Sequence, residues 1–349
     1  MNFRSDNEAP AAPEIMDALA RANHGSAHSY GADAITQRLQ TRFSDLFEID
    51  VAVYPVATGT AANALSLAEL APAYGAVFCH EESHIHTDEC GAPEFYTGGA
   101  KLMPVSGAHG KIDLGRLETM LANMGAHGEH EPAPVALSLT QATEAGTVYQ
   151  VEEITAFGGF AQRHGLSLHL DGARFANALC SLGCSPAEMT WRAGVDILSF
   201  GATKNGAMAA EAVVDFRPPE KRAPHDSFRR RRMRGGHLFS KMRFLSAQLE
   251  AYVEDDLWLK LAAQANQAAA EIAAGLSNRS GVTLLHPVEA NEVFLRADPT
   301  TARALADAGF QFHQWPGAEP VIRLVVPYNV ESSAVLGLLA CLTESPASI

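Results

Sequence analysis

The chain has 349 residues, 47% of them hydrophobic and 19% charged, so it exceeds the usual size of one domain and can bury a sizeable core. Its formal net charge of −14 argues against a nucleic-acid or anionic-membrane partner, because phosphate binding depends on Lys and Arg. Residues 1–20 lack the apolar run of a secretion signal, and no stretch approaches the roughly 18 apolar residues that span a bilayer. We therefore expect a cytoplasmic protein.

The N-terminal part predicts a polar arm followed by a helix over residues 13–22. On composition alone, Arg4, Ser5 and Asp6 are typical of a solvated tail. A second helix is expected after Asp33, because the side chain of Asp33 can cap it and apolar residues recur there at helical spacing.

A strand expected over residues 51–56 leads through Thr58, Gly59 and Thr60 into an Ala- and Leu-rich helix. Gly59 lets the backbone approach an anion, and the first turn of the helix offers unpaired N–H groups and the positive end of its dipole. Many strand-to-helix turns contain Gly and Thr without binding anything, so an ordinary turn is the alternative. The pattern predicts a phosphate site only together with the Lys and Asp that occur later in the chain.

Three histidines follow the next expected strand, residues 76–79, in a stretch that also contains acidic residues. In an extended segment His84 and His86 would face the same side, where Asp88 or Glu89 could complete a metal site. His84 could instead lie against a flat cofactor ring beside a titratable substrate hydroxyl, and an ordinary structural role is the third possibility. The five cysteines are scattered and expected to be reduced, so we predict no metal.

The most informative stretch is residues 166–206, where two apolar runs of strand type flank an Ala-rich segment with room for a helix. The first run ends at Asp171, shortly before Arg174, and the second ends shortly before Lys204. Open α/β sheets place their ligands at the carboxyl ends of such strands. An enzyme that uses pyridoxal phosphate (PLP) needs a Lys to hold the aldehyde as a Schiff base and an acidic partner for the pyridine nitrogen. Lys204 and Asp171 fit these two roles.

Strands and helices alternate from residue 51 to residue 216, which predicts an α/β domain with a mostly parallel, doubly wound sheet. The pattern after this domain predicts two long helices and then a small α+β domain. The expected units are an N-terminal arm and helix over residues 1–30, a large domain over residues 31–254 and a small C-terminal domain over residues 255–349.

Taken together, these motifs resemble the threonine aldolase family of PLP enzymes, which has the aspartate-aminotransferase-like fold (fold type I). The matching segments are RSD at residues 4–6, YG at 30–31, TGTAAN at 58–63, SHI at 83–85, DGARF at 171–175, Lys204 and IRLV at 322–325. CHEESHIHTDECGAPEF, LTQATE and SFGATKNG look more like the phenylserine aldolase branch. The resemblance implies PLP-dependent cleavage of L-threonine, L-allo-threonine or L-phenylserine to glycine and an aldehyde.

The resemblance also implies roles for individual residues. The cofactor would be held by Lys204, Asp171, Thr58, Gly59, Thr60, His84, Arg174 and Thr140. His84 would stack on the ring and act as the candidate base for the substrate hydroxyl. Ser5 and Arg323 would bind the substrate carboxylate, and Arg174 would lie close to that carboxylate or to the phenolic oxygen of the ring. Tyr30 would come from a neighbouring subunit, because the family resemblance implies a dimer or tetramer with shared sites.

Two segments depart from the family pattern. Where many relatives have ENTHN-like and GGGMRQ stretches, this chain has LTQAT and GGHLFSK, so the Arg expected in the second stretch is missing. We expect Lys241 or a member of the basic run at residues 229–234 to replace it at the phosphate, although a charge run is usually a solvated face. The second His of the family, a substrate ligand, is assigned to His130 ahead of His127.

Two other functions compete with this reading. One is a different PLP reaction on the same fold, either transamination or β-elimination. The other is a non-catalytic α/β protein that kept the fold, and the joint presence of Lys204, Asp171 and Arg323 argues against it.

Overall fold

The computed structural model describes residues 1–222, 227–276, 281–315 and 320–343. A seven-stranded sheet has the order β1-β7-β6-β5-β4-β2-β3. Its strands are β1 (Ala52–Val56), β2 (Gly75–His80), β3 (Lys101–Val105), β4 (Ala133–Thr140), β5 (Ser167–Gly172), β6 (Ile197–Gly201) and β7 (Glu211–Asp215). Only β7 runs against its neighbours, β1 and β6. The predicted mostly parallel sheet is confirmed, although neither β3 nor the direction of β7 was predicted.

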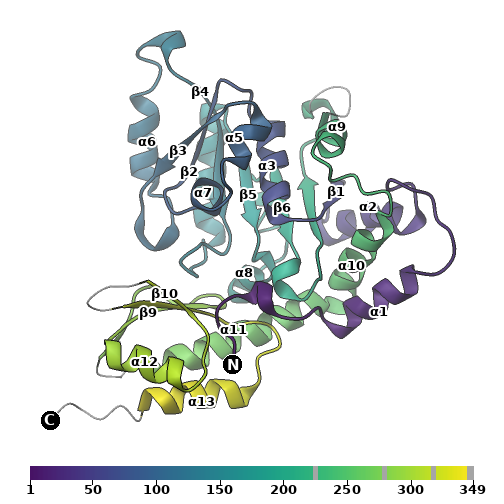
Figure 1. Ribbon diagram of the computed structural model, residues 1–349. Coiled ribbons are helices and arrows are strands. Elements are labelled where there is room, and N and C mark those ends of the chain that lie inside the picture. The colour runs from purple at the N-terminus through teal and green to yellow at the C-terminus, as the bar shows by residue number, and fades with distance from the viewer. Residues whose placement is uncertain (223–226, 277–280, 316–319, 344–349) are drawn as a thin grey trace.

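Helices cover both faces of this sheet (Figure 1). They include α3 (Gly59–Leu70), α4 (His84–Thr87), α5 (Ala92–Thr97), α6 (Leu114–Ala122), α7 (Val151–His164), α8 (Phe175–Leu182) and α9 (Ser227–Arg234). The side chains of Ile197 and Leu198, successive residues of β6, face opposite sides of the sheet. Ile197 belongs to the apolar cluster that contains Leu65 of α3, whereas Leu198 belongs to the cluster that contains Ile154 of α7. The arrangement confirms the predicted doubly wound α/β architecture.

Four further helices flank the large sheet in the sequence, two before β1 and two after α9. They are α1 (Pro13–Ala22), α2 (Ala34–Phe47), α10 (Arg243–Val253) and α11 (Leu257–Leu276). The predicted bounds of α1 and the break between α10 and α11 are confirmed. Asp33 caps α2 as expected, because its Oδ1 accepts a hydrogen bond from the N–H of Thr36 at 2.8 Å.

The C-terminal part forms a second sheet of four strands in the order β10-β11-β9-β8. Its elements are β8 (Val282–Leu284), β9 (Glu292–Ala297), α12 (Pro299–Asp307), β10 (His313–Trp315), β11 (Val321–Val325) and α13 (Ser332–Thr343). Helices α12 and α13 lie on one side of this sheet (Figure 1). This unit has its own apolar core and is the small α+β unit that the sequence predicted.

The N-terminal arm is not a solvated tail. Phe3 is 1% exposed and belongs to the core of the second sheet. Its N–H donates to the carbonyl of Gln311 at 2.8 Å, and its own carbonyl accepts from the N–H of Val325 at 2.8 Å. Composition suggested a solvated segment because the arm is polar, whereas one buried aromatic ring and backbone pairing hold it in place.

The histidine-rich segment is helical and not extended. His84 begins α4, so His84 and His86 point in different directions around the helix axis. His86 is exposed, whereas His84 is half-buried. The metal alternative therefore loses its geometric basis, and no cluster of three His, Cys, Asp or Glu side chains suited to a metal occurs among the described residues.

None of the described helices could cross a membrane. The cytoplasmic location stays a prediction.

Candidate active site at the carboxyl edge of the sheet

A cavity of about 450 Å³ lies at the carboxyl ends of β4, β5 and β6, beside the first turn of α3. Predicted site residues in its lining are Thr58, Gly59, Thr60, His84, Thr140, Asp171, Arg174 and Lys204. Asp171 lies in β5, and Lys204 lies in the 3-10 turn Thr203–Asn205 after β6. Because β5 and β6 are adjacent and parallel, their carboxyl ends meet at one edge. The structure therefore brings the predicted Lys and Asp to one cavity.

Asp171 is buried, and both of its carboxylate oxygens accept hydrogen bonds. Oδ1 accepts from the N–H of Ala173 at 3.0 Å, and Oδ2 accepts from Nδ2 of Asn63 at 2.8 Å. Nδ2 of Asn63 also donates to Oε1 of Glu89 at 2.9 Å, and the same oxygen lies 2.9 Å from Nδ1 of His84. A continuous chain of hydrogen bonds therefore connects Asp171 with His84 and fixes the orientation of both side chains.

His84 is held by two carboxyl groups. The hydrogen bond that His84 donates to Glu89 raises the pKa of His84, because the carboxylate favours the imidazolium form more than burial opposes it. The backbone N–H of His84 donates to Oε1 of Glu144 at 2.7 Å. The imidazole is consequently paired through its Nδ1 atom and remains protonated to higher pH than an ordinary histidine.

Two carboxyl groups of the cavity were not predicted. Glu144 follows β4 and Glu211 begins β7, and both line the cavity. Burial raises the pKa of each to about 7, because the ionised carboxylate loses its hydration. One oxygen of Glu211 accepts from the N–H of Ala202 at 2.8 Å. Both groups therefore titrate near neutral pH inside a cavity that also holds Lys204.

Arg174 makes contacts within the chain that were not predicted. Its Nε and Nη2 donate to the two oxygens of Asp6 at 2.8 and 3.1 Å, and its Nη1 lies 3.2 Å from Oε2 of Glu292. Although burial opposes ionisation, the Arg174 guanidinium holds the pKa of Asp6 below its ordinary value. Burial raises the pKa of Glu292. Arg174 lines the cavity, but its guanidinium is already shared by two carboxylates and fixes the arm to the cavity wall.

A second cavity of about 740 Å³ shares His84, Glu144 and Lys204 with the first. The predicted carboxylate ligands Ser5 and Arg323 line this outer cavity. Arg323 lies on β11, and its Nε atom is buried without a hydrogen-bond partner among the described residues. A substrate carboxylate would supply the missing acceptor.

Three predicted residues line neither cavity. Tyr30 is 55% exposed, and its N–H donates to the carbonyl of Ser240 at 3.0 Å, so Tyr30 and the exposed Lys241 lie on the same surface. His130 precedes β4, whereas Thr140 at the other end of that eight-residue strand lines the inner cavity. A strand of this length spans roughly 25 Å, so His130 does not reach the cavity of its own chain, and its role as a substrate ligand stays a prediction.

The basic run lies on α9 and contributes no residue to either cavity. Arg232 is buried, donates to the carbonyl of Pro55 at 3.2 Å and lies 5.7 Å from the centroid of the Tyr54 ring. Arg229 and Arg234 are exposed. The run therefore combines a structural Arg with a solvated face, as the ordinary interpretation of a charge run implies.

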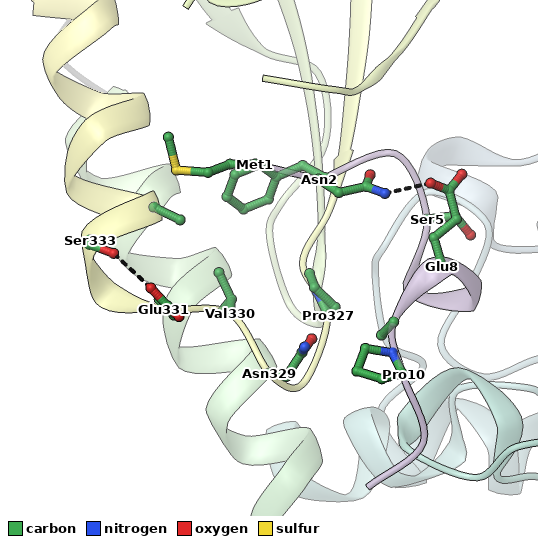
Figure 2. A pocket seen from close by; sticks show the side chains of 13 residues that line it. Met1, Asn2, Ser5, Glu8, Pro10, Pro327, Asn329, Val330, Glu331 and Ser333 are labelled. Atoms are coloured by element: carbon green, nitrogen blue, oxygen red, sulfur yellow. Dashed lines mark hydrogen bonds between the residues drawn. The ribbon is translucent and has the colours of Figure 1, made fainter. Parts of the chain in front are cut away.

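A separate cavity of about 320 Å³ lies between the N-terminal arm and the start of α13 (Figure 2). Asn2 donates to Glu8 on one side of it, and Ser333 donates to Glu331 at 3.2 Å on the other. No Lys, Arg or His side chain is among the described residues that line it. This cavity has no lysine side chain to hold a cofactor aldehyde, so the candidate active site is the pair of cavities around Lys204.

Comparison with known proteins agrees with this geometry. A family model described as beta-eliminating lyase matches residues 2–300. A low specificity L-threonine aldolase from Pseudomonas sp. strain NCIMB 10558 is 40% identical over 338 residues, which cover 97% of this chain and 96% of that protein. A second, from Pseudomonas aeruginosa, is 43% identical over 315 residues, or 90% and 89% of the two chains. The chain belongs to the threonine aldolase family.

A structural comparison extends this relationship over the whole fold. The solved structure of a Leishmania major threonine aldolase is 27% identical, superimposes with a TM-score of 0.91 and covers 98% of each chain. The threonine aldolase family belongs to the PLP enzymes of fold type I, which confirms the fold class that the sequence predicted. Membership in the phenylserine aldolase branch stays a prediction.

The residues of the inner cavity fit the PLP of the threonine aldolase family. Thr58 caps α3 by accepting from the N–H of Ala61 at 3.1 Å, so the N–H groups of Gly59 and Thr60 at the first turn have no partner within the helix. A Cβ atom added at Gly59 would meet nothing within 4 Å, which leaves room for a phosphate at this turn. No described residue forms a hydrogen bond or ion pair with the Lys204 amine. The phosphate turn, a free amine and a buried carboxylate are thus present together.

Proposed function

We propose that this protein is a PLP-dependent aldehyde-lyase that cleaves L-β-hydroxy-α-amino acids to glycine and an aldehyde. One observation carries the proposal: Lys204 and Asp171 line the same cavity as the first turn of α3. Lys204 would hold the cofactor aldehyde, Asp171 the pyridine nitrogen and the α3 turn the phosphate. The Pseudomonas relatives, named low specificity L-threonine aldolases, support the reaction type.

The outer cavity would bind the amino acid. Arg323 and Ser5 would hold the α-carboxylate, and the buried Nε of Arg323 would gain the acceptor that it lacks. This anchoring would direct the β-hydroxyl toward the wall that both cavities share. When bound, PLP supplies an electron sink for the electron pair left on Cα. The chain itself orients the substrate and accepts its hydroxyl proton.

The proposal is tested by incubating the PLP-loaded protein with L-threonine, L-allo-threonine and L-phenylserine. We expect equimolar glycine and aldehyde from each substrate that is cleaved. Formation of a keto acid and ammonia from L-threonine would instead indicate β-elimination, and a keto acid that requires an added acceptor would indicate transamination. A protein that gains no visible absorption with PLP would support the non-catalytic alternative.

We also propose that aromatic β-substituents, as in L-phenylserine, are preferred substrates. The outer cavity has an aromatic side made by His286, Phe294, His313 and Trp315. The rings of Phe294 and Trp315 are stacked with centroids 6.2 Å apart, and the ring of His313 packs edge-on against Trp315 at 4.2 Å. Such a surface favours an aryl group over a methyl group, because ring contacts add about 0.5–1.5 kcal/mol beyond area burial.

Replacing Trp315 with Ala is expected to lower kcat/KM for L-phenylserine about 3- to 10-fold while changing that for L-threonine less than about 2-fold. The ring of Trp315 is 42% exposed, so its removal leaves the fold intact. The measurement is initial-rate kinetics with both substrates, and Tyr74→Ala, an exposed aromatic before β2, is the control. Because the Arg323 guanidinium lies 6.0 Å from the Trp315 ring, an equal loss for both substrates would assign Trp315 to holding Arg323 and contradict the aryl site.

We propose further that the protein is a homo-oligomer, a dimer or tetramer, with active sites shared between subunits. The common surface of Tyr30 and Lys241 supports this assembly, because both are exposed in the single chain. A partner would then supply Tyr30 to the substrate and Lys241 to the phosphate. Light scattering at catalytic concentrations tests the assembly, and a fully active monomer would contradict it.

A further inference from the structure

Glu144 lies in the wall that the inner and outer cavities share. Its Oε1 is fixed by the N–H of His84 at 2.7 Å, whereas its Oε2 is buried and has no hydrogen-bond partner among the described residues. The turn that carries Glu144 is held by Thr143, whose N–H donates to Thr147 and whose carbonyl accepts from Gly146, both at 2.9 Å. A rigid turn therefore presents one free carboxyl oxygen at the boundary of the two cavities.

His84, the other candidate base, is less suited to accept a proton. Its Nδ1 lies 2.9 Å from Oε1 of the buried Glu89, which favours the charged imidazolium. An imidazolium has no free lone pair, so it cannot act as a general base until it loses that proton. Among the described residues, Glu144 has a free oxygen and no cationic side chain in a hydrogen bond with it.

We propose that Glu144, and not His84, removes the proton from the β-hydroxyl group of the substrate. The inference rests on the proposed aldol cleavage. Oε2 of Glu144 takes the hydroxyl proton, and the electron pair of the O–H bond becomes the second C–O bond of the aldehyde. The Cα–Cβ bond breaks, its electron pair stays on Cα, and Cα gains one proton to become the CH2 group of glycine. The proton taken by Glu144 balances the proton gained at Cα.

The surroundings of Glu144 set the pH at which it can work. Burial and the charge of Asp171 raise the pKa of Glu144 to about 7, while the N–H and the side chain of His84 act in the opposite direction. Arg174, Cys79 and Tyr149 also interact with it electrostatically, and Lys204 lines the same two cavities. A general base must be ionised, so kcat/KM is expected to rise with pH through about 7 and to level off above it.

The test compares Glu144→Gln with wild type in the PLP-loaded enzyme. The amide keeps the shape of the side chain and an oxygen for the His84 N–H, but it cannot take a proton. We expect kcat for L-phenylserine to fall by about 100-fold or more and the rise near pH 7 to disappear. Exchange of the glycine α-hydrogen with solvent deuterium needs no β-hydroxyl proton transfer, so the variant is expected to keep it. Glu118→Gln, on the exposed face of α6, is the matched control.

Each outcome decides between specific alternatives. Retained exchange with lost cleavage supports the proposal. Unchanged cleavage and an unchanged pH profile in Glu144→Gln would overturn it, as would a parallel loss of exchange and cleavage, which indicates a structural role. His84→Asn provides a second measurement: loss of the rise near pH 7 in that variant would assign the base to His84. Wild-type enzyme that exchanges the glycine hydrogen but never releases an aldehyde would refute the proposed function itself.

Discussion

Replacing Lys204 with Ala is expected to reduce aldehyde release by at least about 1,000-fold. Lys204 is the one lysine among the described residues that line the two cavities. It lies on the turn after β6, beside the carboxyl end of β5. The variant should also fail to develop the visible absorption band that a lysine Schiff base of PLP gives.

The controls separate this effect from damage to the fold. The melting temperature without PLP is expected to stay within a few degrees of wild type, because a half-buried lysine without an ion pair contributes little stability. Lys101→Ala, on the exposed side of β3, should keep both the band and the activity. A Lys204→Ala protein that retains the band and a tenth of the activity would show that another amine carries the cofactor.

The features that could be predicted from the sequence depend on local patterns. Strand-to-helix alternation, a capping Asp33 and apolar spacing identified the large sheet and α2, because these signals act within a few residues. The direction of β7 could not be predicted in this way, because its strand pattern is the same whether it runs parallel or antiparallel to β6. The bounds of α1 were predictable because Pro13 starts the helix.

At the site, too, residues marked by a local pattern could be predicted, whereas contacts between residues far apart in the sequence could not. Lys204 and Asp171 were found because Asp171 lies at the carboxyl end of one strand and Lys204 just after another, and parallel strands end at one edge of the sheet. The pairing of Arg174 with Asp6 joins residues 168 positions apart, and no local pattern encodes it. Glu144 was missed because an acidic residue in a turn ordinarily faces solvent, and only the folded cavity shows that its Oε2 atom is buried.

His130 and His84 show how position along a strand limits prediction. Both were assigned from the family pattern, but only His84 follows its strand at the carboxyl edge. His130 precedes β4 and lies at the opposite edge. The edge rule that located Lys204 would therefore have rejected His130 for the cavity of its own chain.

Replacing Asp171 with Asn is expected to lower kcat for L-threonine by roughly 1,000-fold while PLP still binds. A carboxylate beside the pyridine nitrogen keeps that nitrogen protonated, whereas a neutral amide cannot. The substitution nearly preserves shape, and Oδ1 can still accept from the N–H of Ala173, as it does at 3.0 Å in the wild type. The loss should therefore come from charge, and the pH dependence of the absorption of bound PLP should change with it.

A matched variant distinguishes charge from orientation. Asn63→Ala removes the 2.8 Å hydrogen bond to Asp171 but leaves its carboxylate in place, so we expect a loss of only about 10-fold. The measurement compares the rates and absorption spectra of the two variants at equal PLP saturation. If Asn63→Ala lost as much activity as Asp171→Asn, the hydrogen-bond chain to His84 would matter more than the negative charge. If Asp171→Asn stayed within about 10-fold of wild type, Asp171 would not be the partner of the pyridine nitrogen, since the protonated ring depends on that charge.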